Sequence, residues 1–264
     1  MMVTVMGVGL FAPGLAGWNA ENRACLAGAR PYQSAALPVF APLALPRNEA
    51  RRVSFSIRLA LQVAQEACID AGWNPADCAS VFACSGGDTE ALDKIQSALL
   101  LPDKPVSPNQ FTHSVHNAPA GYWAIVAGSR QSTISLSAFD ASFAAGLLEA
   151  ASFSAVQRQP VLLVAHDTPP PPPLQRFRRV TEPFAVALAL SPAQTGHERE
   201  RLTLALTDAG GTETLADPGL EQLRLANPAA RGLSLLRLLA ARRRGRVILP
   251  YFEPAGLRVD YAPC

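Results

Sequence analysis

Residues 132–165 contain the feature that most restricts the fold, a helix with almost no polar face between two apolar strands. Residues 141–153 are so rich in Ala, Gly, Leu and Phe that they predict a helix that is apolar nearly all round. A helix of this kind is buried. The runs 132–137 and 160–165 predict the strands before and after it. The chain is therefore expected to form a layered α/β protein with this helix in its interior.

Strands and helices also alternate through the rest of the chain. The clearest helix is 52–72, because its apolar residues recur at helical spacing and Gly72 follows its last turn. Residues 31–46 are rich in Pro and Ala and predict an irregular surface stretch. The prolines of 169–173 predict an extended segment between two parts of the chain, or alternatively a ligand for a proline-binding module. The further predicted strands are 3–9, 80–84, 184–190, 202–206, 246–249 and 257–261, and the further helices are 18–28, 89–100, 117–128 and 233–241.

Charge and cysteine spacing exclude several classes of protein. The net charge of +2 gives no reason to expect a nucleic acid or an anionic membrane as partner. No apolar run is long enough to span a membrane, and residues 1–17 lack the basic start of a signal peptide. The five cysteines form no Cys-x-x-Cys pair, and Gly7 and Gly9 lack the third glycine of a dinucleotide-binding loop. We expect a cytoplasmic protein without metal, cofactor, nucleic-acid partner or membrane insertion.

Two segments together resemble a known family. Asn117, Ala120 and Gly121 form an Asn-x-x-Ala-Gly motif at the start of a predicted helix, and the stretch 137–142 reads Ser-Ala-Phe-Asp-Ala-Ser at the start of the buried one. This pattern resembles the β-ketoacyl synthases of the thiolase-like superfamily. In that family the nucleophilic Cys begins the buried helix, in a context like Thr-Ala-Cys-Ser-Ser. Counting from either side places the nucleophile at residue 140, which is Asp here.

The order of other pieces agrees with this resemblance over about residues 1–167, whereas the match after the prolines is poor. The resemblance implies a thiolase-like layered αβαβα fold with a shortened C-terminal half. The expected parts are a ketosynthase-like half at 1–167, a proline-rich connection at 168–176 and an abbreviated half at 177–264. We expect the two halves to pack as one unit.

The residues that a ketosynthase uses for chemistry are missing at the matching positions. The family needs a Cys thiolate to take the acyl group, and two histidines from its C-terminal half. Asp140 stands in place of the Cys, and only His166 and His197 follow it, neither in the family's sequence context. The chain is therefore expected not to be an enzyme by itself. For Asp140 the sequence favours a cap on the following helix over a carboxylate nucleophile.

Four other residues are weaker candidates for chemistry. His113 and His116 could share a helical face and hold a metal, but no carboxylate or Cys lies nearby in sequence, so hydrogen-bonded structural histidines are favoured. Cys84 could be a displaced nucleophile, although a buried cysteine at the end of a strand is far commoner. Ser85 lacks the Gly-x-Ser-x-Gly elbow of a hydrolase.

Among family members without the Cys, the chain is most similar to chain-length factors, and especially to the small ones of bacterial aryl polyene biosynthesis. The resemblance implies a heterodimer with an active β-ketoacyl synthase, and through it contact with an acyl carrier protein. Its dimer strand would be Ser132, Thr133, Ile134, Ser135, Leu136 and Ser137, and its acyl-tunnel residues Gln110, Phe111, Ser114 and Val115. The alternatives are a stand-alone acyl-thioester acyltransferase or thioesterase, and a homodimeric scaffold. Product length, starter unit and self-dimerisation are not predicted.

Overall fold

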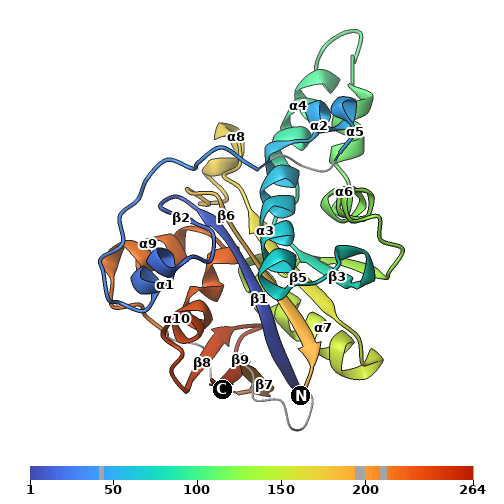
Figure 1. Ribbon diagram of the computed structural model, residues 1–264. Helices are drawn as coiled ribbons and strands as arrows, with labels where there is room; N and C mark the ends of the chain where they lie inside the picture. The colour runs from blue at the N-terminus through green and yellow to red at the C-terminus, as the bar shows by residue number, and fades with distance from the viewer. Residues whose placement is uncertain (42–44, 194–199, 209–212, 264) are drawn as a thin grey trace.

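The computed structural model describes residues 1–41, 45–193, 200–208 and 213–263 (Figure 1). In this part of the chain the strands form one mixed sheet in the order β4-β3-β5-β6-β1-β7-β9-β8, with β2 paired to β1. Strand β3 is parallel to β4 and β5, and the other pairs are antiparallel. The strands are β1 (Met2–Ala12), β2 (Leu15–Ala16), β3 (Ala79–Ala83), β4 (Thr133–Leu136), β5 (Val161–Asp167), β6 (Phe184–Pro192), β7 (Arg201–Thr207), β8 (Gly245–Pro250) and β9 (Gly256–Ala262).

Helices cover both faces of this sheet. Helices α3 and α6 pack on one face, and α7 packs on the other with α1, α9 and α10 in the same apolar cluster. The helices are α1 (Ala20–Leu26), α2 (Arg47–Arg52), α3 (Phe55–Ala71), α4 (Thr89–Leu99), α5 (Pro108–His113), α6 (Ala118–Ala127), α7 (Ser142–Gln157), α8 (Pro172–Gln175), α9 (Pro218–Ala226) and α10 (Leu233–Ala241), with short 3-10 turns η1 (Pro75–Asp77), η2 (Phe139–Ala141) and η3 (Ala229–Gly232). The layered α/β prediction is confirmed.

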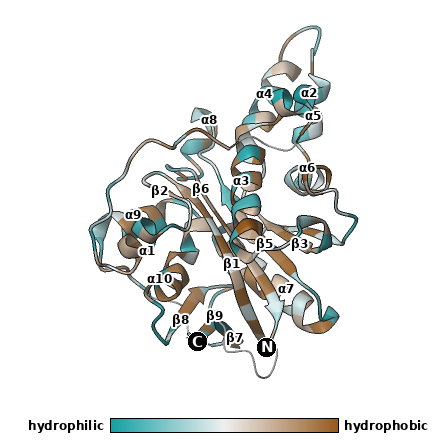
Figure 2. Cartoon of the chain, in the orientation of Figure 1, coloured by the Kyte–Doolittle hydropathy of each residue, from teal (hydrophilic) through white to brown (hydrophobic). Residues whose placement is uncertain are grey.

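The buried helix predicted at 141–153 is α7. Its first turn follows η2, and Phe143, Leu147 and Ala150 are fully buried or nearly so. The core around α7 joins residues of β3, β5 and β6 to residues of β7, β8 and β9. The strands β1, β5 and β6 are predominantly hydrophobic along their length (Figure 2). A strand buried on both faces needs such a continuous apolar run.

The two glycines of β1 allow α3 to lie directly against the sheet. A Cβ atom at Gly9 would lie 2.1 Å from the carbonyl oxygen of Val63, and one at Gly7 would lie 2.5 Å from the carbonyl oxygen of Ala67. Past Thr4, β7 no longer pairs with β1, and carboxylates of α3 accept β1 N–H groups instead: Asp70 from Val8 and Glu66 from Leu10. Gly7 and Gly9 therefore serve helix–sheet packing.

The proline-rich connection and the strand predicted at 132–137 differ from the prediction. The prolines 169–173 are not extended throughout, because α8 begins at Pro172, and proline is tolerated in a first helical turn where its missing N–H has no partner to lose. The strand predicted at 132–137 is shorter by one residue at each end, since β4 is Thr133–Leu136 and both Ser132 and Ser137 flank it. Among the described residues, no helix has both the length and the apolar character that crossing a membrane requires.

Candidate functional site

The carboxyl ends of the parallel strands β3, β4 and β5 bring together polar residues that lie far apart in sequence. Cys84 and Ser85 follow β3, Asp140 lies in η2 after β4, and His166 and Asp167 end β5. Ligand sites of open α/β sheets occur at this edge of the strands. These residues therefore define the candidate site.

The carboxylate of Asp167 is the central acceptor of this site. Its Oδ1 accepts hydrogen bonds from the Ser85 N–H at 2.8 Å, the Ser85 hydroxyl at 2.6 Å and the Cys84 thiol at 3.4 Å. Burial raises the pKa of Asp167 to about 6, and the hydrogen bonds from Ser85 limit that rise. The side chain of Asn227 donates to the backbone carbonyls of Asp167 and Glu182, so it fastens the end of β5 to the start of β6.

Cys84 lacks the environment of a nucleophile. The residue is 3% exposed, and burial together with the neighbouring Asp167 carboxylate raises the pKa of its thiol well above the ordinary value. The thiol thus stays protonated, and a protonated thiol does not attack an acyl thioester. This geometry supports the interpretation of Cys84 as a buried structural cysteine.

Asp140 does not cap α7, and that prediction was wrong. Its Oδ1 instead accepts a hydrogen bond of 2.6 Å from the guanidinium of Arg178, in an ion pair across 38 positions of sequence. The N-cap position of α7 is Ala141, whose side chain cannot accept a bond. Within this turn the Ser142 hydroxyl accepts from the Ala138 N–H. The carboxylate of Asp140 thus pairs with a residue distant in sequence and not with the backbone N–H groups at the start of α7.

The guanidinium of Arg178 also lies over the ring of Phe139, 3.8 Å from its centroid. Phe139 has a φ of +51°, a left-handed conformation that is uncommon for an aromatic residue and is found most often where the surroundings enforce it. In the turn before α7, the carboxylate of Asp140 is therefore paired with Arg178, and Arg178 is stacked on the ring of Phe139. A carboxylate paired in this way is a poor nucleophile.

Each histidine that the structure describes has a hydrogen-bond partner of its own. His166 is 1% exposed, its Nδ1 lies 3.4 Å from the Ser56 hydroxyl, and burial lowers its pKa to about 3, so it stays neutral. His113 bonds to Tyr122 and His116 to Leu136, so the prediction that both are hydrogen-bonded is confirmed. His197 lies outside the described residues. No group of three or more potential metal ligands occurs among the described residues.

The four residues predicted to face the acyl tunnel lie in α5 and the turn after it. Phe111 is 65% exposed and Val115 is 47% exposed, while Gln110 and Ser114 are half-buried. The α4–α5 pair projects from the body of the molecule at the top of Figure 1. Whether these side chains line a tunnel stays a prediction.

Strand β4 lies at one end of the sheet and pairs only with β3 among the described strands. The carbonyls of Ser132 and Leu136 accept the N–H groups of Ser80 and Cys84. Because backbone groups alternate along a strand, those of Thr133 and Ser135 point to the open edge. An unpaired edge of this kind is a template for another strand.

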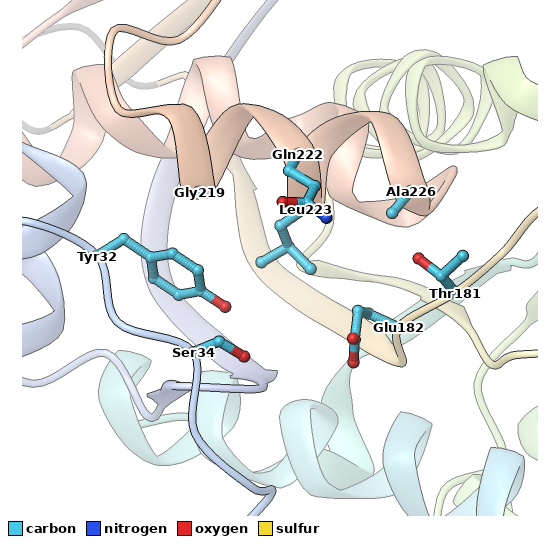
Figure 3. Close-up of a pocket in the computed structure, with 8 residues that line it drawn as sticks. All are labelled: Tyr32, Ser34, Thr181, Glu182, Gly219, Gln222, Leu223 and Ala226. Carbon is cyan, nitrogen blue, oxygen red and sulfur yellow. The ribbon is translucent and has the colours of Figure 1, made fainter.

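A pocket of about 210 Å³ lies elsewhere, between the stretch around Tyr32, the approach to β6 and helix α9 (Figure 3). It contains none of the predicted site residues. The residues that line it are Tyr32, Ser34, Thr181, Glu182, Gly219, Gln222, Leu223 and Ala226.

Three residues of the site were not predicted from sequence, namely Asp167, Arg178 and Asn227. Asp167 lies two residues after the strand predicted at 160–165, and a polar residue at the end of a buried strand is a usable signal. Arg178 and Asn227 carry no local signal, because their partners lie 38 and 60 positions away.

The Asp167→Asn variant is expected to remove a pH-dependent part of the stability. The native carboxyl, with its pKa of about 6, holds its proton more tightly than an unfolded Asp at 3.8, so its contribution is full at low pH and declines as the pH rises through 6. Because one pKa unit is worth 1.36 kcal/mol and pH 4 already lies just above the unfolded pKa, the free energy of unfolding of the wild type relative to the variant should fall by about 2 kcal/mol between pH 4 and pH 7.5. Urea unfolding of both proteins at both pH values measures this, and a pH-independent difference would contradict it.

Comparison with known proteins places the chain in a family. Residues 18–246 match the family described as "Beta-ketoacyl synthase, N-terminal domain". No match is found among curated protein sequences.

Solved structures share the fold along nearly the whole chain. A chain of the "Ketosynthase (ApeO) in Complex with its Chain Length Factor (ApeC) from Xenorhabdus doucetiae" is 24% identical, with coverage of 98% of this chain and 99% of that one and a TM-score of 0.74. "The ishigamide ketosynthase/chain length factor" is 13% identical, with 99% coverage of both chains and a TM-score of 0.68. A type II polyketide synthase complex of an acyl-carrier protein with its ketosynthase, "AntDE:AntF", is 13% identical, covers 100% and 99%, and has a TM-score of 0.73.

These likenesses confirm the thiolase-like α/β fold. The family match extends over most of the chain, from α1 to β8, and includes both the Asn117 motif and the turn at Asp140. The chain belongs to the β-ketoacyl synthase family.

Proposed function

We propose that the chain is a non-catalytic chain-length-factor subunit that pairs with an active β-ketoacyl synthase and shapes the acyl tunnel of that enzyme. One observation carries the proposal: where the family places its nucleophilic Cys, this chain has Asp140 in an ion pair with Arg178. A carboxylate there would in any case form a reactive mixed anhydride with an acyl group, which is a poor store. In this proposal the partner ketosynthase supplies the nucleophilic Cys.

Two further observations support a heterodimer. Two of the solved structures with the same fold are described as ketosynthases with chain length factors, and a third as a ketosynthase with its acyl-carrier protein. Strand β4 has an open edge on which a partner strand could pair. By the same argument the acyl carrier protein would meet this chain only through the complex. We assign the product, more narrowly, to the polyunsaturated acyl chains of aryl polyene synthesis.

The tunnel-facing role rests on sterics. Phe111 and Val115 are large apolar side chains that are exposed in the lone chain, and a partner would cover them. A packed wall resists each added methylene, because inserting it forces side chains out of their preferred rotamers. With Gln110 and Ser114, these residues would form the floor that limits chain growth.

Co-expression of this chain with a tagged ketosynthase of such a pathway tests the proposal. We expect a one-to-one complex by native mass determination, and products longer by one or more two-carbon units when Phe111→Ala removes bulk from the floor. Ile69→Ala is the matched control, since Ile69 is an exposed apolar residue on α3, and it should leave product length unchanged. Turnover of an acyl thioester by the lone chain would favour the stand-alone enzyme, and a self-dimer that ignores the ketosynthase would favour the scaffold.

A further inference from the structure

The segment 108–116, here called the tunnel segment, consists of α5 and the turn that follows it. Helix α5 has only six residues, and an isolated helix so short is not stable in water. Among the regular elements its main contact is α4, which projects from the body together with it. The position of the tunnel segment must therefore be set by side chains that reach the rest of the fold.

His113 connects the end of α5 to α6. It is 4% exposed, and its Nε2 lies 3.3 Å from the hydroxyl of Tyr122, a residue of α6 that is itself 8% exposed. The two rings also meet edge to face, with centroids 5.8 Å apart. Burial lowers the pKa of His113, so the imidazole is neutral and one ring nitrogen remains available as an acceptor.

His116 connects the other end of the segment to β4. Its Nε2 lies 3.0 Å from the carbonyl oxygen of Leu136, and because a carbonyl only accepts, the imidazole must donate from Nε2. The ring packs beside Gly87, where an added Cβ would lie 3.3 Å from Nδ1. Leu136 is the last residue of β4, the strand with the open edge.

We infer that His113 and His116 are positioning residues that hold the tunnel segment between α6 and β4 and thereby set product chain length. The inference rests on the proposed function. Ser114 and Val115 lie between the two histidines, and Gln110 and Phe111 lie one turn before the first. Loss of either histidine contact is therefore expected to move these four side chains together without changing the side chains themselves.

Two variants release the anchors with little change of shape. Tyr122→Phe removes the hydroxyl bonded to His113 and keeps the ring, and His116→Leu removes the donor to Leu136. His116→Gln keeps an N–H donor and should restore the wild-type product. Thr112→Val is the matched control, because the Thr112 hydroxyl donates only to the Pro108 carbonyl within α5.

The first readout needs no partner. In the lone chain, amide hydrogen exchange across 108–116 should become roughly two- to tenfold faster in Tyr122→Phe, the range expected for one lost hydrogen bond, and should stay unchanged in Thr112→Val. Unchanged exchange in Tyr122→Phe would overturn the anchoring.

The second readout is the product of the co-expressed complex. We expect Tyr122→Phe and His116→Leu to form the one-to-one complex, but to broaden or shift product length by at least one two-carbon unit, whereas His116→Gln should not. Wild-type product lengths in all variants would overturn the inference and leave the proposed function standing. Failure of the wild type to capture a ketosynthase would instead overturn the proposed function.

Discussion

A Ser135→Pro variant is expected to lose its ketosynthase partner, with affinity lowered about 100-fold, while the chain itself stays folded. The N–H of Ser135 points to the open edge of β4, because the ladder to β3 uses the alternate residues Ser132 and Leu136. Proline removes that N–H and would leave the partner's carbonyl unpaired, at a cost of about 1–3 kcal/mol, and its ring would also occupy the place of a partner strand, so we expect a loss of roughly 100-fold in Kd. The Ser135 hydroxyl has no hydrogen-bond partner among the described residues, so its loss costs little.

Titration of the tagged ketosynthase with each variant measures this effect, and circular dichroism checks the fold. Ser135→Ala is the control, since it keeps the N–H and loses only the hydroxyl, and its affinity should stay within about threefold of the wild type. A proline variant that binds as tightly as the wild type would show that the partner does not pair along β4.

Gly9→Ala is expected to lower the free energy of unfolding by about 3 kcal/mol or more. The new Cβ would lie 2.1 Å from the carbonyl oxygen of Val63 and 3.0 Å from the backbone nitrogen of Ala67. Both are backbone atoms of α3, so relief requires the whole helix to move away from β1. Overpacking commonly costs 1–3 kcal/mol even where side chains can yield, and total stabilities are only about 5–15 kcal/mol.

Urea unfolding followed by circular dichroism measures the change. Gly121→Ala provides the contrast, because Gly121 lies in α6 with no atom within 4 Å of an added Cβ, and replacing a helical glycine there should add about 0.5–1 kcal/mol. Equal stability of Gly9→Ala and the wild type would disprove the close contact between α3 and β1.

Local patterns predicted most elements because the buried face of a helix or strand repeats at a characteristic spacing along the sequence. Helix α10 has the predicted bounds, and α3 ends at Ala71 with Gly72 in a left-handed cap. Helix α5 was not predicted, since six residues with an exposed Phe111 carry no helical period. The start of α8 inside the prolines was missed because the pattern alone does not distinguish a first helical turn from an extended run.

The candidate site was predicted less completely than the fold. The register of the family motif located Asp140 from the sequence, and the histidines were correctly favoured as hydrogen-bonded residues. Their partners were not foreseen, because the Tyr122 hydroxyl and the Leu136 carbonyl belong to elements whose relative positions depend on the packed sheet. The same holds for Asp167, whose raised pKa arises from burial that no sequence window reports.

By itself, the sequence determined the α/β pattern, the family motifs and the absence of a Cys at position 140, because each of these is a property of neighbouring residues. Only the tertiary structure decided what Asp140 does. A capping bond and an ion pair with Arg178 were both open to that carboxylate, and the choice depended on where the chain after the prolines comes to lie. Arg178, which is stacked on Phe139, lies 38 positions from Asp140 in sequence. The two side chains meet only because the folded sheet brings their segments together.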